Sequence, residues 1–543
     1  MNARPFAAVL ALGLGAAGCG GGSHAVPPHA AAAPAAKQRV AFTMRWPSRA
    51  ATAARRPSFV SPSAASVIVE VNPDAAPAGA VTFANAPAGG GTSTIAIDAP
   101  PGNDVFLISV YDQPQTTGET AATGNELGRV RVAQTVLANT TNTLSATVVG
   151  TVAAVRIGPL PNQSAVVPIP ASSPAGYELV GRAPAVFTVA PLDVDGNVIV
   201  QPDAPPAISL APNVRATGVF TVTPVTGTTD QFTVQAVAPN TTQYPTSLVA
   251  TATDANGNLA TSSTVVDVTS AVYVAYANGG APSVARFDPH GTPLPLPAGA
   301  FAGLGDPQAL AYDPADRAIF VADAAHNTVL AFDESGAPLA GYAAPAVAGA
   351  NGVTYDPHNG NVYASGSAGV TVFAPNGGPP LGGVPPSFAA ANARGIAFMG
   401  PSPNGSLNAL AVGDTGTPQL AFFRESGSPA GTSALSAAPI AVAFGAPVPI
   451  TQTPQTLAQL YVTTASGIVA FDAYGGPLTT AADAGAPFGI AIDPNVNEPR
   501  VADRGANALT TYLDDLSAVD AARTFTTAAA LGLTQPQGVC HVF

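Results

Sequence analysis

Aspartate and histidine supply the most regularly spaced reactive groups in this sequence. Asp313, Asp356 and Asp493 each precede a proline, and His290 and His358 each follow an Asp-Pro pair. A carboxylate beside an imidazole can act in acid–base catalysis or hold a metal ion. Asp-Pro is also a turn signal, because a short hydrogen-bond acceptor precedes a residue of fixed φ. The periodic repetition favours the turn, and we expect both histidines to be exposed loop residues.

Sequence signatures of catalysis are absent. The chain has no Gly-x-Ser-x-Gly elbow, His-Glu-x-x-His pair, Cys-x-x-Cys pair, phosphate-binding loop or dinucleotide fingerprint. Of its two cysteines, Cys540 lies in an apolar run and is interpreted as a small buried hydrophobic residue. We therefore predict no catalytic residue, no metal site and no cofactor.

The strongest pattern is an internal repeat in the C-terminal half. An apolar strand motif occurs six times, with its central residue recurring every 43 to 49 residues. Such a period indicates stacked supersecondary units. The central residues are Leu310, Val353, Ile396, Val442, Ile490 and Val539.

The copies resemble NHL repeats. Most continue into a second strand such as Ile319–Asp323, which ends in Val-Ala-Asp and is followed by Asn327, and then into a third such as Val329–Asp333. The resemblance implies a six-bladed β-propeller over residues 271–543, in which each blade is a small antiparallel sheet that buries its faces by stacking.

The two ends of the repeat predict how the ring closes. Val272–Tyr276 matches a second strand but has no first strand before it, whereas Gln537–His541 matches a first strand with nothing after it. We expect the C-terminal strand to complete the blade that begins at residue 272, which removes an exposed sheet edge.

In such propellers, ligands commonly bind at one mouth of the central channel, where the innermost strands begin. The repeat places Gln308, Asn351, Arg394, Ile440, Phe488 and Gln537 there. Amides, one guanidinium group and one aromatic ring suit a glycan or a peptide terminus. The predicted binding residues are Gln308, Asn351, Arg394, Phe488 and Gln537.

An enzymatic alternative also follows from the resemblance, because six-bladed propellers include metal-dependent lactonases of the gluconolactonase type. Those enzymes hold a divalent cation with carboxylates and an asparagine in the channel. None of the six predicted mouth residues here is a carboxylate, which disfavours a hard cation. A lactonase or lyase of the cell envelope remains the second hypothesis.

The N-terminus resembles a bacterial lipoprotein signal. Residues 1–18 combine Arg4, an apolar run and the small residues Ala16-Ala17-Gly18, directly before Cys19. The resemblance implies that Cys19 is acylated and anchors an exported protein to a membrane. Gly20 replaces the aspartate that resembles an inner-membrane retention signal, which favours the outer membrane where the cell has one. Residues 19–37 are interpreted as a flexible tether.

Between the tether and the repeat, strand patterns and turn clusters alternate. They predict an antiparallel β-sandwich over 38–151 and a second over 152–270, the latter similar to Ig-like modules of bacterial surface proteins. The turns Asp193–Asn197 and Asp254–Asn258 fit hairpins, with Ca²⁺ binding as the alternative. The expected fold is thus all-β, with two Ig-like sandwiches followed by the propeller.

Charge and composition narrow the function. The chain has 55 glycines and 55 prolines in 543 residues, which suits short strands and tight turns, and a net charge of −13. Outside a basic stretch near residues 37–56 the chain is acidic, which excludes a nucleic-acid partner. We predict a non-enzymatic, membrane-anchored lipoprotein whose propeller binds a protein or glycan. A purely structural envelope protein is the third hypothesis.

Overall fold

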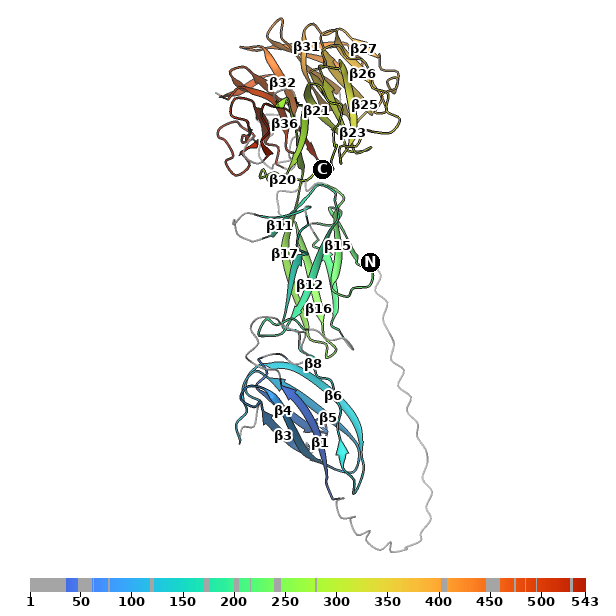
Figure 1. Cartoon of the computed structure of the whole chain (residues 1–543), viewed down its shortest axis with the longest axis vertical. Helices are drawn as coiled ribbons and strands as arrows, with labels where there is room; N and C mark the ends of the chain where they lie inside the picture. The colour runs from blue at the N-terminus through green and yellow to red at the C-terminus, as the bar shows by residue number, and fades with distance from the viewer. Residues whose placement is uncertain are drawn as a thin grey trace, which may run out of the picture. The chain divides into compact units, whose positions relative to one another are not determined.

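The computed structural model describes a chain built from strands and turns (Figure 1). The described residues are 36–46, 61, 63–76, 79–117, 122–163, 165–169, 176–199, 205–214, 216–238, 246–278, 281–401, 408–445, 460–472, 475–483, 485–494, 496–527 and 531–543. The predicted signal, Cys19 and nearly all of the tether lie outside them. No described helix is long and apolar enough to cross a membrane.

The chain divides into two compact units. The first lies within Met1–Ala50, Ala64–Asn125 and Arg129–Val148, and the second holds the rest, chiefly Val149–Phe543. In the first unit, one sheet has the order β4-β1-β7 and another contains β3, β2, β5 and β6 in that order. Its strands are β1 (Gln38–Trp46), β2 (Ser66–Val71), β3 (Val81–Asn85), β4 (Gly91–Ala99), β5 (Gly102–Tyr111), β6 (Glu126–Val136) and β7 (Asn142–Thr143).

The second unit begins with a two-sheet sandwich. Its sheets have the orders β10-β11-β17-β16-β13 and β14-β15-β12-β9. Alternate residues of β12, such as Phe187, are buried in one core with Leu248 and Val266 of the facing sheet. The strands, with the short β8 before them, are β8 (Val149–Gly150), β9 (Ala154–Pro159), β10 (Val166–Pro168), β11 (Gly176–Val180), β12 (Ala185–Leu192), β13 (Ala207–Pro212), β14 (Phe220–Pro224), β15 (Gln231–Ala236), β16 (Ser247–Thr253) and β17 (Leu259–Thr269).

The prediction of purely antiparallel sandwiches was wrong at one pair in each unit. β1 pairs in parallel with β7, and β11 in parallel with β17. In the second case five strands, β12 to β16, lie between the two partners in the chain, so β11 and β17 run in the same direction side by side without a hairpin between them. The turns at Asp193 and Asp254 are hairpin turns, because antiparallel pairs flank each of them, Leu192 with Val198 and Thr253 with Leu259. Each carboxylate also accepts backbone N–H groups of its own turn.

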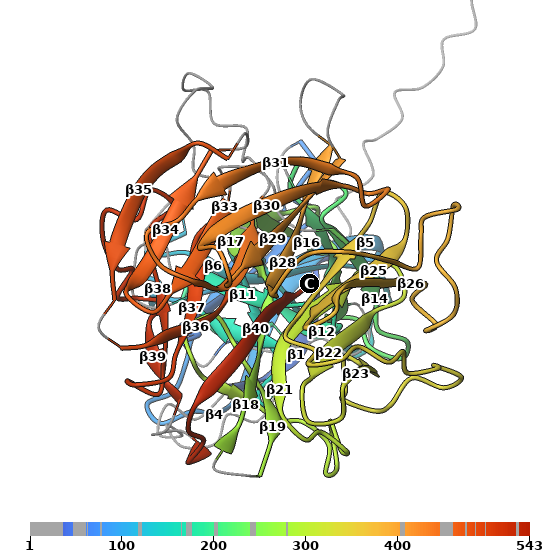
Figure 2. The same ribbon diagram turned by 90° about the horizontal axis from the view of Figure 1, so that it is seen from above.

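Six antiparallel sheets of the described residues follow between Ala271 and Val542. Figure 2 shows them succeeding one another around a centre in chain order. Their strands are β18 (Ala271–Tyr276), β19 (Ser283–Phe287), β20 (Pro293–Leu294), β21 (Pro307–Asp313), β22 (Ala318–Asp323), β23 (Thr328–Asp333), β24 (Gly352–Asp356), β25 (Asn361–Gly366), β26 (Gly369–Phe373), β27 (Ser387–Phe388), β28 (Ala393–Pro401), β29 (Asn408–Asp414), β30 (Gln419–Arg424), β31 (Pro429–Ala434), β32 (Pro439–Phe444), β33 (Leu460–Thr464), β34 (Gly467–Phe471), β35 (Pro477–Ala482), β36 (Pro487–Ile492), β37 (Pro499–Asp503), β38 (Ala508–Thr511), β39 (Phe525–Thr526) and β40 (Pro536–Val542).

This part of the chain is a β-propeller. The innermost strands contact one another around a ring in the order β21, β24, β28, β32, β36, β40 and back to β21. The C-terminal β40 pairs with β18, with Val272 opposite His541, as the repeat pattern predicted. Apolar residues of neighbouring sheets pack between the blades, for example Phe320 of one sheet with Val362 of the next.

Glycine lets the inner strands approach at the ring centre. A Cβ atom on Gly395 would lie 2.8 Å from Ala441 Cα, and one on Gly538 would lie 2.8 Å from Ala309 Cα. Every copy of the repeat has glycine or alanine at this position, namely Ala309, Gly352, Gly395, Ala441, Gly489 and Gly538. Small residues therefore allow the inner strands to meet at the ring centre.

The propeller has two distinguishable faces. The first strands begin at one face, with Gln308 near the start of β21, and run toward the other, where Tyr312 donates a hydrogen bond to the Phe543 carbonyl at 3.1 Å. Phe543 itself is buried in the sandwich core. We call the first the mouth face and the second, which meets the sandwich, the junction face.

Candidate functional site

The central channel is too narrow for an organic ligand. Its cavity has a volume of about 40 Å³ and is lined by the inner-strand starts, among them Gln308 and Asn351. That volume accommodates about a water molecule. A ligand of the propeller centre must therefore bind across the mouth rather than inside the channel.

Two of the predicted mouth amides hold neighbouring blades together. Asn351 donates to the carbonyl of Ala393 at 3.0 Å, and its amide oxygen accepts a hydrogen bond from Ser365 at 2.8 Å. Gln537 is 2% exposed and donates to Asp306 at 3.2 Å. Their hydrogen bonds go to the protein itself, whereas Gln308 lines the channel and is half-buried.

The other two predicted residues meet at the mouth and are joined by a third. Arg394 lies over the Phe488 ring at 5.4 Å from its centroid, and Arg504 lies over the same ring at 3.3 Å. Phe488 is 8% exposed. Two guanidinium groups thus share one buried aromatic platform, an arrangement that the repeat pattern had shown only in part.

Electrostatics at this platform are unfavourable to the two cations. Burial lowers the pKa of Arg394. Burial also lowers the pKa of Arg504, with Asp306 opposing that shift and the like charge of Arg394 adding to it. Among the described residues, neither guanidinium group forms a salt bridge, and Arg504 Nε is buried without a hydrogen-bond partner. The mouth therefore carries two half-buried positive charges that the protein leaves uncompensated by an ion pair.

Sequence reasoning missed Arg504 because it considered only first strands. Arg504 directly follows Asp503, the last residue of the second strand β37, and antiparallel pairing returns this end to the mouth beside Pro487. The corresponding residues after the other second strands are Ala277, Ala324, Ser367, Thr415 and Ala465. A single arginine among uncharged residues at one repeat position was the available signal.

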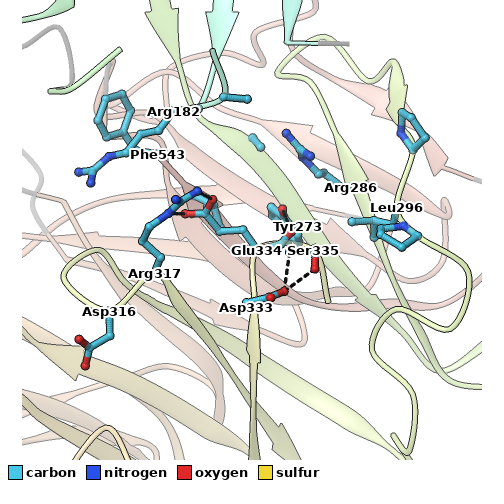
Figure 3. A pocket seen from close by; sticks show the side chains of 16 residues that line it. Arg182, Tyr273, Arg286, Leu296, Asp316, Arg317, Asp333, Glu334, Ser335 and Phe543 are labelled. Carbon is cyan, nitrogen blue, oxygen red and sulfur yellow. Dashed lines mark hydrogen bonds and ion pairs between the residues drawn. The ribbon is translucent and has the colours of Figure 1, made fainter. Parts of the chain in front are cut away.

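A larger pocket lies at the junction face. Its volume is about 400 Å³, and it is lined by Arg182 of the sandwich with Tyr273, Arg286, Arg317 and Glu334 of the propeller. Figure 3 shows Arg317 reaching Glu334 and Arg182 beside Phe543, with Arg286 on the other side near Leu296. Arg182 lies 5.0 Å from the Phe543 ring centroid and Arg286 lies 5.9 Å from that of Tyr273.

Hydrogen bonds within the protein occupy much of this pocket. Glu334 accepts from Arg317 Nε at 3.0 Å and from the Tyr312 hydroxyl at 2.7 Å, while its carbonyl accepts from Tyr273 at 2.6 Å. Because Glu334 and one of the three arginines are already paired with each other, the pocket mainly connects the sandwich to the propeller.

Both histidines that follow Asp-Pro contact acidic residues at this face. His290 is 19% exposed and lies 3.1 Å from Glu178 of the sandwich, so the expectation of an exposed loop was wrong there, because the sandwich covers this turn. The Glu178 hydrogen bond raises the pKa of His290, against burial. His358 is 56% exposed and lies 3.2 Å from Glu425. Together with Asp356, these two side chains form a group that can hold a metal ion.

Comparisons with known proteins find only distant likeness. No protein-family model matches the chain, and no curated protein matches it significantly. A chain in a crystal structure of a nidogen/laminin complex has a TM-score of 0.36 and 14% identity, over 50% of this chain and 98% of that one. A protein of unknown function from Bacteroides caccae has a TM-score of 0.36 and 13% identity, over 50% of this chain and 99% of that one. Virginiamycin B lyase from Staphylococcus aureus has a TM-score of 0.30 and 12% identity, over 59% of this chain and 88% of that one. At this level the ligand and the activity must be argued from the side chains.

Proposed function

We propose that this protein is an exported, lipid-anchored binding protein whose propeller recognises an anionic group of a protein or glycan at the channel mouth. The observation that carries the proposal is the pair of guanidinium groups, Arg394 and Arg504, held over Phe488 without an ion pair to any described residue. A carboxylate, sulfate or phosphate placed there supplies the missing counter-charge and accepts bidentate hydrogen bonds from the planar guanidinium groups.

The geometry limits how a ligand binds. Because the channel cavity is only about 40 Å³, the anionic group sits across the mouth and the rest of the ligand extends over the surface. Phe488 is 8% exposed, so it orients the two arginines and offers little surface of its own for stacking with a sugar. We infer that a carboxylate is the recognised group, as in a uronic-acid glycan or a peptide C-terminus.

The remaining parts of the chain serve presentation in this proposal. Acylation at Cys19 anchors the protein to the envelope, the outer membrane where one exists, and residues 19–37 form the tether. The two sandwiches, proposed as Ig-like modules, act as spacers, and the propeller is proposed to be of the six-bladed NHL type. Mass spectrometry of the mature N-terminus tests the anchor, since a Cys19→Ser variant is expected to lose the acyl chains and leave the membrane fraction.

The binding proposal is tested on the full chain with a carboxylate ligand array. Arg394→Gln and Arg504→Gln are each expected to weaken binding about 10-fold or more, because each removes a charge-assisted hydrogen-bond donor. Arg424→Gln is the matched control, since it removes the same charge from the exposed last residue of β30, in another part of the ring. Uronic-acid and peptide arms of the array distinguish the two sources of the carboxylate.

Two results with the variants would overturn this function. One is binding that is unaffected in the Arg394→Gln, Arg504→Gln double variant. The other is an equal loss in Arg424→Gln, which would indicate non-specific attraction of anions to a positive surface. A ligand whose affinity is insensitive to salt would also contradict recognition by two partly exposed charges.

A further inference from the structure

A separate group of side chains lies where two neighbouring blades meet. Asp356 ends β24 and His358 follows it in the turn to β25, while Glu425 lies in the turn between β30 and β31, 67 residues from His358. One ligand atom from each of the three side chains lies within 4.8 Å of the others. In the described part of the chain, no other group of three such side chains is as close.

Asp356 brings a buried carboxylate oxygen without a hydrogen-bond partner to this group. Its side chain has no exposed surface, and Oδ1 accepts the backbone N–H of His358 at 2.8 Å. Its Oδ2 atom is buried and has no hydrogen-bond partner among the described residues. A buried carboxylate oxygen without a donor is costly, and a cation removes that cost.

The same turn elsewhere provides a comparison. Asp288 and Asp313 also have buried Oδ2 atoms without partners, so the blade turn itself produces the orphaned oxygen. Neither has a histidine and a second carboxylate at ligand distance, although His290 follows Asp288 at the same spacing. Of these three turns, only the Asp356 turn combines the orphaned oxygen with a nearby histidine and a second carboxylate, because Glu425 of the next blade lies beside it.

The donor set determines the class of metal. One imidazole nitrogen with two carboxylate oxygens suits a first-row divalent metal such as zinc, whereas magnesium and calcium prefer oxygen alone. Zinc bonds to nitrogen and oxygen of about 2.0–2.2 Å place tetrahedral ligand atoms about 3.4 Å apart. The three ligand atoms here, without a metal ion, lie within 4.8 Å of one another. His358 is 56% exposed, so its ring can turn inward and also leaves an entry path for the ion.

Outer contacts already position these ligands. Asn359 donates from Nδ2 to Glu425 Oε2 at 3.1 Å and contacts the Tyr363 hydroxyl at 2.9 Å. Hydrogen bonds that orient ligating carboxylates are a regular part of metal sites. The contact of 3.2 Å between His358 Nδ1 and Glu425 Oε1 is the one that a metal would replace.

We propose that Asp356, His358 and Glu425 form a zinc-class divalent metal site that clamps two adjacent blades together at the junction face. Three protein ligands leave one position for water. The ion neutralises the orphaned carboxylate and ties β24 to the turn after β30. This inference does not depend on the mouth or on its ligand.

The test is zinc binding by the full chain after chelator treatment, measured by isothermal titration calorimetry. We expect about one equivalent of tightly bound zinc, and a loss of at least about 100-fold in affinity in His358→Ala and in Glu425→Gln, since each removes one of three ligands. His290→Ala is the matched control, because it alters the other Asp-Pro-His turn and leaves the three ligands in place. Zinc should also raise the Tm of the control but not that of Glu425→Gln.

The proposal fails if the wild-type chain binds no zinc, or if Glu425→Gln and His358→Ala bind it as tightly as His290→Ala does. The latter result would assign the metal to other residues of the chain. If the variants do not fold, X-ray absorption spectroscopy of the zinc-loaded wild type identifies the ligand atoms instead. One imidazole with oxygen ligands supports the clamp, and sulfur or several imidazoles overturn it.

Discussion

The junction face of the propeller holds Arg500 differently from the way in which the mouth face holds Arg394 and Arg504. At the junction face, Arg500 is fully buried, and the charges of Asp493 and Glu498 lie near it. At the mouth face, Arg394 and Arg504 have an aromatic ring beneath them and no salt bridge among the described residues. A buried charge that is hydrogen-bonded inside the protein with acidic groups nearby contributes to the fold, whereas a charge without such partners among the described residues is available to a ligand.

The largest effect is expected from removing the strand that connects the two faces. β40 carries Gln537 at the mouth and leads to Phe543 in the sandwich core, and it pairs with β18 along its length. Deleting residues 536–543 should abolish cooperative thermal unfolding, because it opens the ring and exposes a strand edge. Phe543→Ala alone should cost about 3–4 kcal/mol. A truncated chain with an unchanged transition, followed by circular dichroism, would contradict the role of this strand.

Arg500 should be the most sensitive single charge. Its side chain donates from Nε to Thr511 at 3.0 Å and from Nη2 to the Pro289 carbonyl at 3.1 Å, and burial lowers its pKa to about 10. Arg500→Met should reduce the free energy of unfolding by about 3–5 kcal/mol, because Asp493 and Glu498 then lack a buried counter-charge. Urea denaturation measures the change. A loss under about 1 kcal/mol would mean that Arg523, 3.6 Å from both acids, is sufficient.

The junction face should also give stability two opposing pH dependences. Burial raises the pKa of Glu498 from 4.5 to about 7 and lowers that of His541 from 6.5 to about 4. The folded state holds the Glu498 proton more tightly, so this group makes stability fall as pH rises from 4.5 to 7. The neutral His541 makes stability rise with pH from 4 to 6.5.

Variants separate these two contributions. His541→Asn should leave a stability that falls with rising pH, and Glu498→Gln should leave one that rises, with slopes that integrate to on the order of 1–3 kcal/mol. Urea denaturation between pH 4 and 8 provides the measurement. Parallel pH profiles in the two variants would show that neither group has the shifted pKa.

The smallest effect is expected at the mouth. Arg504→Gln should change the free energy of unfolding by no more than about 0.5 kcal/mol, and in the stabilising direction, because it removes the repulsion from Arg394. The difference between the two faces would be contradicted if Arg504→Gln destabilised the protein as strongly as Arg500→Met. In that case the mouth cations would be part of the fold and not a binding site.

Much of the fold was predictable because its signals are local. The strands predicted at Ile319–Asp323 and Val329–Asp333 lie within β22 and β23, since a short apolar run is a property of each strand alone. The repeat likewise predicted that Gln537–His541 pairs with the strand at residue 272. Parallel pairing of β11 with β17 was not predicted, because no local pattern records which distant strand becomes a neighbour.

The residues of the two candidate sites likewise divide into those that the sequence pattern placed and those that only the tertiary structure placed. Repeat position alone brought Arg394 and Phe488 to the mouth, and composition alone indicated an all-β chain with tight turns. Arg504 lies beside them only because β37 pairs antiparallel with β36 and therefore ends at the mouth face. Glu425 contacts His358 only because two blades lie next to each other. Strand formation follows from neighbouring residues and their alternation, whereas charge pairing depends on distances between segments far apart in the chain. Those distances exist only once the ring has closed.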